Sequence, residues 1–264
     1  MEQFVQELKN IYSTNKVVED NNLDLVIDTV NIYCNGLSKL TGIDVSYFQN
    51  IVKKIDFIRF SIDNELKKLE VENDCKTYNF NKNNKTGIIV KEVDECRMVD
   101  GLTHEMTHFF IKFYVDSNLL SERNLNLDEK SSRLYEGICE FINQETWHKI
   151  NPEKETIGEM EDKYWIEVQV ASFLMDSMNK NLFLKNIFTD PNCIFDKIKN
   201  IKYQNTNLLN YIDTQLKPLI PLKGVYNKDE VGDVDILDSF EAICDCGKML
   251  KLGGNHNEVN SQRK

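Results

Sequence analysis

His104-Glu105-Met106-Thr107-His108 is the stretch of sequence that decides the expected fold. It lies in residues 96–115, whose apolar side chains recur at helical spacing, so we predict a helix there. Two histidines four positions apart lie about 40° apart around a helix and project from one face. Their imidazole nitrogens can therefore bind one tetrahedral zinc ion. Glu105 lies beside them and is placed to take a proton from a water molecule at that ion.

A catalytic zinc site needs a third protein ligand. His108 is followed by Phe109-Phe110-Ile111-Lys112-Phe113, which supplies no histidine. We therefore predict that Glu136, on a second helix over residues 132–148, is the third ligand. Glu140 lies one turn further along the same face, where it can accept a hydrogen bond from a ligating histidine. The alternative interpretation is a pair of surface histidines and a solvated acidic helix face.

The segments HEMTH and LYEGICEFI resemble the gluzincins, the HExxH peptidases whose third ligand is a glutamate on a later helix. The resemblance is to the aminopeptidase-like branch and its short relatives, and it covers residues 86–190. It implies a zincin-like fold, peptide-bond hydrolysis and one Zn2+ per chain. The residues that match are the metal ligands His104, His108 and Glu136, the base Glu105, and the outer acid Glu140. No Gly-x-Met-Glu-Asn motif precedes the first helix, so recognition of a free substrate amine is not expected.

Two further features extend the candidate site. Residues 164–174, YWIEVQVASFL, are similar to the helix that follows the ligand helix in short family members, and Tyr164 is our candidate donor to the developing oxyanion. Tyr135 is the other candidate, and core packing is the alternative role for both. In this fold class a sheet edge binds the peptide backbone by strand addition. We assign that role to Gly87, Ile88 and Ile89, with an ordinary buried strand as the alternative.

The remaining patterns predict an α+β, mainly helical fold, with a small sheet before the motif helix and a helical lobe after it. A strand over residues 55–62 competes with a helix over 46–60, and residues 116–130 form a polar connection. Gly42 closes the second helix. We expect residues 1–95 to form the N-terminal helices and small sheet of the catalytic unit, and residues 96–223 to form a zinc-binding helical lobe. Residues 224–264 are expected to form an acidic segment and a polar tail. Further elements are expected as helices over 2–13, 22–40, 160–180 and 193–217, and as a strand over 87–91.

Charge and composition restrict the partners. The net charge of −11 argues against a nucleic-acid partner, because phosphate binding needs a basic face. No run approaches the roughly 20 apolar residues of a membrane span, and the first residues show no secretory pattern, so we expect a cytoplasmic protein. Seven scattered cysteines are typical of reduced thiols, and Cys139 is expected to pack in the core. Cys244 and Cys246, with His256, match no standard zinc module.

These observations predict zinc-dependent hydrolysis of a peptide or protein substrate by a water molecule that Glu105 deprotonates. The first alternative is a catalytically inactive zincin-like protein that serves in binding or as a scaffold. A metal-free helical scaffold is the second. A zinc hydrolase that cleaves another bond, such as an epoxide or an amide, is the third.

Overall fold

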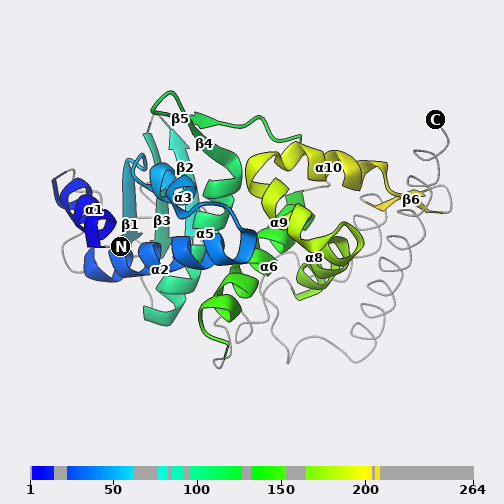
Figure 1. The fold of residues 1–264 in the computed structure, drawn as a ribbon, viewed down its shortest axis with the longest axis horizontal. Coiled ribbons are helices and arrows are strands. Elements are labelled where there is room, and N and C mark those ends of the chain that lie inside the picture. The colour runs from blue at the N-terminus through cyan, green and yellow to red at the C-terminus, as the bar shows by residue number, and fades with distance from the viewer. Residues whose placement is uncertain are drawn as a thin grey trace. The chain divides into compact units, whose positions relative to one another are not determined.

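The computed structural model of the protein (Figure 1) describes the chain in segments, and its architecture is α+β and mainly helical. The described residues are 2–14, 23–61, 77–82, 85–91, 95–126, 132–152, 165–203 and 206–208. The helices are α1 Glu2–Thr14, α2 Leu23–Thr41, α3 Val45–Val52, α5 Glu95–Lys112, α6 Ser132–Ile150, α8 Trp165–Ser177, α9 Lys180–Thr189 and α10 Pro191–Asn200. The strands are β1 Phe57–Ser61, β2 Thr77–Lys82, β3 Lys85–Lys91, β4 Phe113–Asp116, β5 Leu119–Glu122, β6 Lys202–Tyr203 and β7 Thr206–Asn207.

The chain divides into two compact units, of which the first comprises Met1–Asn124 with Asn143–Met160. The second comprises Leu125–Ile142 with Glu161–Lys264. Helix α6 is continuous and contributes residues to both units. No helix in the described part of the chain is long and apolar enough to cross a membrane.

The core of the first unit forms around α2 and α5. Helix α2 contacts α1, α3 and α5, and α5 also contacts β2 and β3. Phe48 of α3 is fully buried, with its ring edge-on to Phe110 of α5 at 5.1 Å between centroids. Gly42 has a φ of +70°, and its N–H donates to Ser38 O at 2.9 Å, which ends α2 in the left-handed conformation that favours glycine. The predicted helices at the N-terminus and the role of Gly42 are confirmed.

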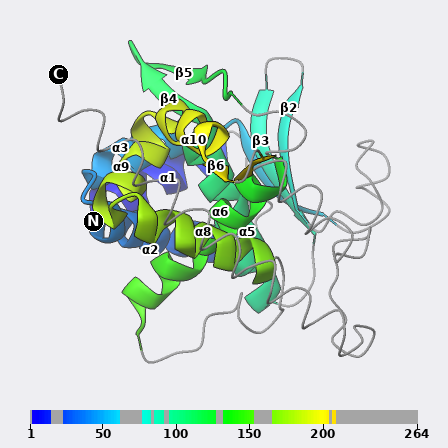
Figure 2. The ribbon, with the colours of Figure 1, turned by 90° about the vertical axis from the view of Figure 1, so that its right-hand side faces the viewer.

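Strand β3 is the central strand of a three-stranded sheet ordered β1-β3-β2. It runs parallel to β1 and antiparallel to β2, so that Ile88 pairs with Ile58 on one side and Asn79 on the other. Figure 2 shows β2 and β3 side by side. The expected position of Gly87, Ile88 and Ile89 at a sheet edge is therefore wrong. Both sides of β3 are occupied, so these residues offer no backbone edge for strand addition.

Residues 46–62, for which a helix and a strand were both considered, contain one of each. Helix α3 ends at Val52, and β1 begins at Phe57, as the strand interpretation predicted. Asp44 caps α3, and its carboxylate accepts a hydrogen bond from Ser46 N at 2.8 Å. This cap fixes the start of α3 beyond the turn at Gly42.

A hairpin replaces the predicted end of the motif helix. Helix α5 ends at Lys112 rather than continuing to residue 115, and β4 pairs with β5 from Phe113↔Glu122 to Asp116↔Leu119. The two turn residues, Ser117 and Asn118, have φ values of 47° and 69°. Positive φ at both positions is the conformation of the tight hairpin turn that matches strand twist. The connection predicted over residues 116–130 therefore contains a strand.

Arg123 fixes the junction between α5 and this hairpin. Its Nη1 donates to the carbonyl oxygens of Ile111 and Phe113, each at 2.8 Å, and more distantly to Phe110 O. Its Nη2 donates to Tyr47 Oη at 2.7 Å, which ties the junction to α3. A cation at the C-terminus of a helix also complements the helix dipole. The end of the helix that carries both histidines is thus held by one guanidinium.

The second unit contains the start of α6 and the helices α8, α9 and α10. Asn179 begins α9, and its side chain accepts a hydrogen bond from Leu182 N at 3.3 Å. Pro191 begins α10, where the fixed φ of proline suits a first helical turn. The helix predicted over residues 160–180 corresponds to α8. The helix predicted over 193–217 is confirmed as far as Asn200 and is wrong at residues 202–203 and 206–207, which form β6 and β7. Residues 209–217 and the predicted acidic tail lie outside the described residues.

Candidate metal centre

The two histidines of the motif face each other on α5. Their Nε2 atoms are 3.1 Å apart, and their ring centroids are separated by 4.8 Å at an interplanar angle of 68°. Both side chains are buried. Glu136 of α6 completes the group: one ligand atom from each of the three residues lies within 4.8 Å of the others. This His/His/Glu group can hold a metal ion.

The geometry of the group fits a divalent ion. Two nitrogens bound to zinc at about 2.0–2.1 Å and at the tetrahedral angle lie about 3.3 Å apart. The observed separation of 3.1 Å between the Nε2 atoms is close to that value. The ligand atoms of the three residues lie within 4.8 Å of one another, and this limit exceeds the ideal separation by about 1.5 Å. Rotation of the half-buried Glu136 side chain can cover the difference.

Buried acidic side chains lie on the two helices that carry the group. Among the described side chains, the only buried aspartate and glutamates are Asp100, Glu105 and Glu140. Each lies within one helical turn of a residue of the His/His/Glu group, on α5 or α6. These carboxylates add negative charge to the two helices that carry the His/His/Glu group, which favours binding of a cation there.

Buried hydrogen bonds hold α5 from the side of α2 and α6. Tyr33 Oη and Thr107 Oγ1 are 2.5 Å apart, and Thr107 Oγ1 donates to Thr103 O at 3.0 Å. Because the Thr107 proton is used in this way, the Tyr33 hydroxyl is the donor of the pair. Trp147 Nε1 of α6 donates to Thr103 Oγ1 at 3.2 Å. These bonds fix the rotation of α5 about its axis, and with it the direction of both histidines.

Not every residue of the predicted site has a place in this centre. Tyr164 lies outside the described residues, as do Cys244, Cys246 and His256. The ring of Tyr135 packs edge-on against Phe195 at 5.9 Å, which favours its packing role. Cys139 is fully buried, as the core interpretation predicted.

The sequence interpretation missed the polar residues behind the motif. These are Tyr33, Asp100, Thr103, Thr107, Asn143 and Trp147. Part of the signal was readable, because Asp100 precedes His104 by one turn and Asn143 and Trp147 continue the helical spacing of Glu136 and Glu140. The bond from Tyr33 joins residues 74 positions apart, and no local pattern predicts it.

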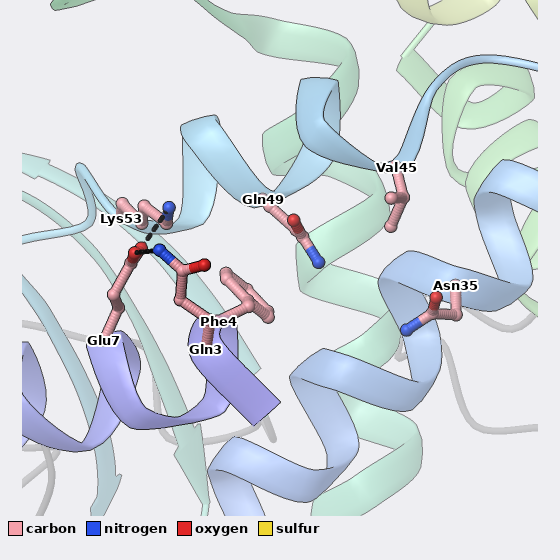
Figure 3. A pocket seen from close by; sticks show the side chains of 7 residues that line it. All are labelled: Gln3, Phe4, Glu7, Asn35, Val45, Gln49 and Lys53. Atoms are coloured by element: carbon pink, nitrogen blue, oxygen red, sulfur yellow. Dashed lines mark hydrogen bonds and ion pairs between the residues drawn. The ribbon is translucent and has the colours of Figure 1, made fainter. Parts of the chain in front are cut away.

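A separate cleft of about 360 Å³ lies among α1, α2 and α3 (Figure 3). Its lining includes Phe4, Asn35, Gln49 and Lys53, and none of the residues of the His/His/Glu group. At one side Lys53 pairs with Glu7. This ion pair and the hydrogen bond from Gln3 hold the pKa of Glu7 below its ordinary value.

Comparison with known proteins gives no relative. No protein-family model matches the chain, and no curated protein or solved structure gives a match. Assignment of a function therefore depends on the chemistry of the chain's own residues.

Proposed function

We propose that the protein is a zinc-dependent peptidase of the gluzincin type with a zincin-like fold. The observation that carries the proposal is the convergence of His104, His108 and Glu136 within 4.8 Å. Between the two histidines lies Glu105, whose side chain is 8% exposed. A buried carboxylate beside a His/His/Glu ligand group is the arrangement that metal-assisted hydrolysis requires.

Two imidazoles and one carboxylate favour zinc, and leave the open position that a hydrolytic site needs. The same ligand types also hold ferrous iron in some oxygenases. The glutamate between the histidines favours hydrolysis, because that reaction needs a base next to the metal ligands. Metal analysis of the purified protein distinguishes the two ions.

The protein's own residues then have defined roles. Zinc, when bound, supplies Lewis acidity that polarises the substrate carbonyl and makes water more acidic. Glu105 accepts the proton of the attacking water and passes it to the leaving amine. Glu140, which is 2% exposed and lies one turn beyond Glu136, is assigned to orient a ligating imidazole. Tyr164 remains our candidate for the oxyanion donor.

The substrate we propose is a peptide or an unfolded protein segment, with no nucleic-acid or membrane partner. We place the activity in the cytoplasm. Among the described residues Cys34, Cys139 and Cys193 form no disulfide, which is typical of a reducing compartment.

Substitution of the proposed base tests the catalytic step. Glu105→Gln is expected to keep stoichiometric zinc and to lose hydrolysis of a fluorogenic peptide library by about 10²–10⁴-fold, because the amide cannot accept a proton. Glu145→Gln, at a half-buried position of α6, is the matched control and should hydrolyse the library at the parental rate. A parent that binds zinc and cleaves no peptide would favour an inactive binding protein.

Removal of a ligand tests the metal site independently of activity. His108→Ala is expected to abolish stoichiometric zinc in elemental analysis, because two ligands hold the ion weakly. His148→Ala, on α6 and outside the His/His/Glu group, should retain zinc. Purified parent protein without bound metal, and without affinity for added zinc, would overturn the proposal.

A further inference from the structure

One buried hydrogen bond joins the motif helix to the ligand helix. Asn143 Nδ2 of α6 donates to Asp100 Oδ1 of α5 at 3.1 Å. The exposed fractions of the two residues are 1% and 4%. The Oδ1 atom of Asn143 is also buried, and it has no hydrogen-bond partner among the described residues. An amide kept in the core with one unsatisfied atom is costly, which indicates that its other bond serves a purpose.

The position of Asn143 relates it to the metal ligand on the same helix. Asn143 follows Glu136 by seven residues, two turns along nearly the same face, and lies about 10 Å away along the axis. Trp147, eleven residues after Glu136, lies on that face too and donates to Thr103. The face of α6 that presents Glu136 is therefore the face that bonds to α5.

The partners on α5 are equally close to the histidines in sequence. Asp100 precedes His104 by one helical turn, and Thr103 is the residue immediately before it. The two hydrogen bonds thus fix α6 against α5 at the level of the motif. Because α6 is one continuous helix, this attachment also sets where Glu136 lies along its axis.

We propose that Asn143 is a positioning residue, which through Asp100 holds the ligand helix at the spacing the metal ion requires. The inference rests on the proposed metal site but goes beyond it, because neither residue belongs to the His/His/Glu group. The directional hydrogen bond of Asn143 specifies one register of the two helices.

The test measures zinc affinity in folded variants by competition with a chelating dye. Asn143→Leu, which is close in volume, and Asn143→Asp, which sets two carboxylates against each other, are each expected to weaken zinc binding by about 10–100-fold. The exchange Asp100→Asn with Asn143→Asp restores a donor–acceptor pair and should regain most of the affinity. Asn31→Leu is the matched control, because Asn31 is a buried asparagine of α2 that accepts its bonds from Asn35 in the same helix.

Cobalt substitution adds a readout that a general loss of stability does not change. Visible absorption of the cobalt protein reports the coordination geometry, and it should change in Asn143→Leu while circular dichroism shows a folded chain. Unchanged zinc affinity and an unchanged cobalt spectrum in folded Asn143→Leu would overturn the inference. So would an exchange variant as weak as Asn143→Asp. A parent protein that binds no zinc would instead overturn the proposed function, and this inference with it.

Discussion

Substitution of Gly36 probes a close approach of α2 to α6. A Cβ atom at Gly36 would lie 2.6 and 2.7 Å from Ile150 Cδ1 and Cγ1, and 2.8 Å from Thr146 Cγ2. Ordinary carbon contacts are about 3.5–4.0 Å, so the neighbouring atoms must give way by about 1 Å. Ile150 Cδ1 lies at the end of its side chain and can turn, but Ile150 Cγ1 and Thr146 Cγ2 are attached to branched Cβ atoms and have little freedom.

The expected cost of Gly36→Ala is a difference of two effects. Overpacking of a core costs about 1–3 kcal/mol, whereas alanine gains about 1 kcal/mol over glycine within a helix. Three contacts below 3.0 Å place the overpacking cost in the upper part of that range, at about 2–3 kcal/mol. We therefore expect a net loss of about 1–2 kcal/mol, or a fall in Tm of roughly 2–8 °C for a chain of this size. Thermal and urea unfolding followed by circular dichroism measure both quantities.

A double-mutant cycle locates the cause of that loss. Ile150→Ala removes two of the three close contacts, so the combined variant should be more stable than the sum of the single effects predicts. Gly42→Ala is the matched control: its Cβ would meet nothing within 4 Å, but its φ of +70° costs an alanine about 1–2 kcal/mol. Ile150→Ala should not rescue it. A Gly36→Ala protein as stable as the parent would refute the close approach of α2 and α6.

Three further changes test the frame around the metal centre. Arg123→Lys should lower the free energy of unfolding by about 1–3 kcal/mol, because one ammonium cannot replace the guanidinium bonds at the end of α5; equal urea midpoints would contradict this. Phe48→Ala should cost about 3–5 kcal/mol in urea unfolding, because it leaves a cavity beside Phe110, and a loss under 1 kcal/mol would contradict the packing. Hydrogen bonds from the Ser46 hydroxyl and N–H lower the pKa of Asp44 below its ordinary value of 3.8. The stabilisation of the folded state by the Asp44 carboxylate is therefore present above pH 3.8, and it is lost as the pH falls through the lower pKa of the folded protein. Asp44→Ala should remove this part of the acid dependence of Tm. An unchanged dependence would contradict the cap.

The long helices and the His/His/Glu group were the predictable part of the structure. The spacing of apolar residues gave α2, and Gly42 marked its end, because both signals are local. The HExxH spacing and Glu136 likewise depend on positions within single helices. Their convergence within 4.8 Å needed only that two predicted helices meet.

The less predictable part depends on pairing between distant segments. The apolar content of Gly87 to Val90 is the same for a central strand and for an edge strand, and only the partners β1 and β2 decide between them. Phe113 continues the apolar face of α5, so periodicity extended that helix too far. The positive φ values at Ser117 and Asn118 reverse the chain instead. No residue pattern revealed that Asn143 would meet Asp100.

If the His/His/Glu group holds zinc as proposed, the stability of the helices α5 and α6 that carry it will depend on metal supply. With a divalent ion bound, the carboxylates near it contribute attraction. In a chelating medium this contribution of the bound ion to folding is lost. Amide hydrogen exchange along these two helices should therefore quicken first when zinc is scarce, and the lifetime of the protein in a cell would then follow the cell's zinc reserve.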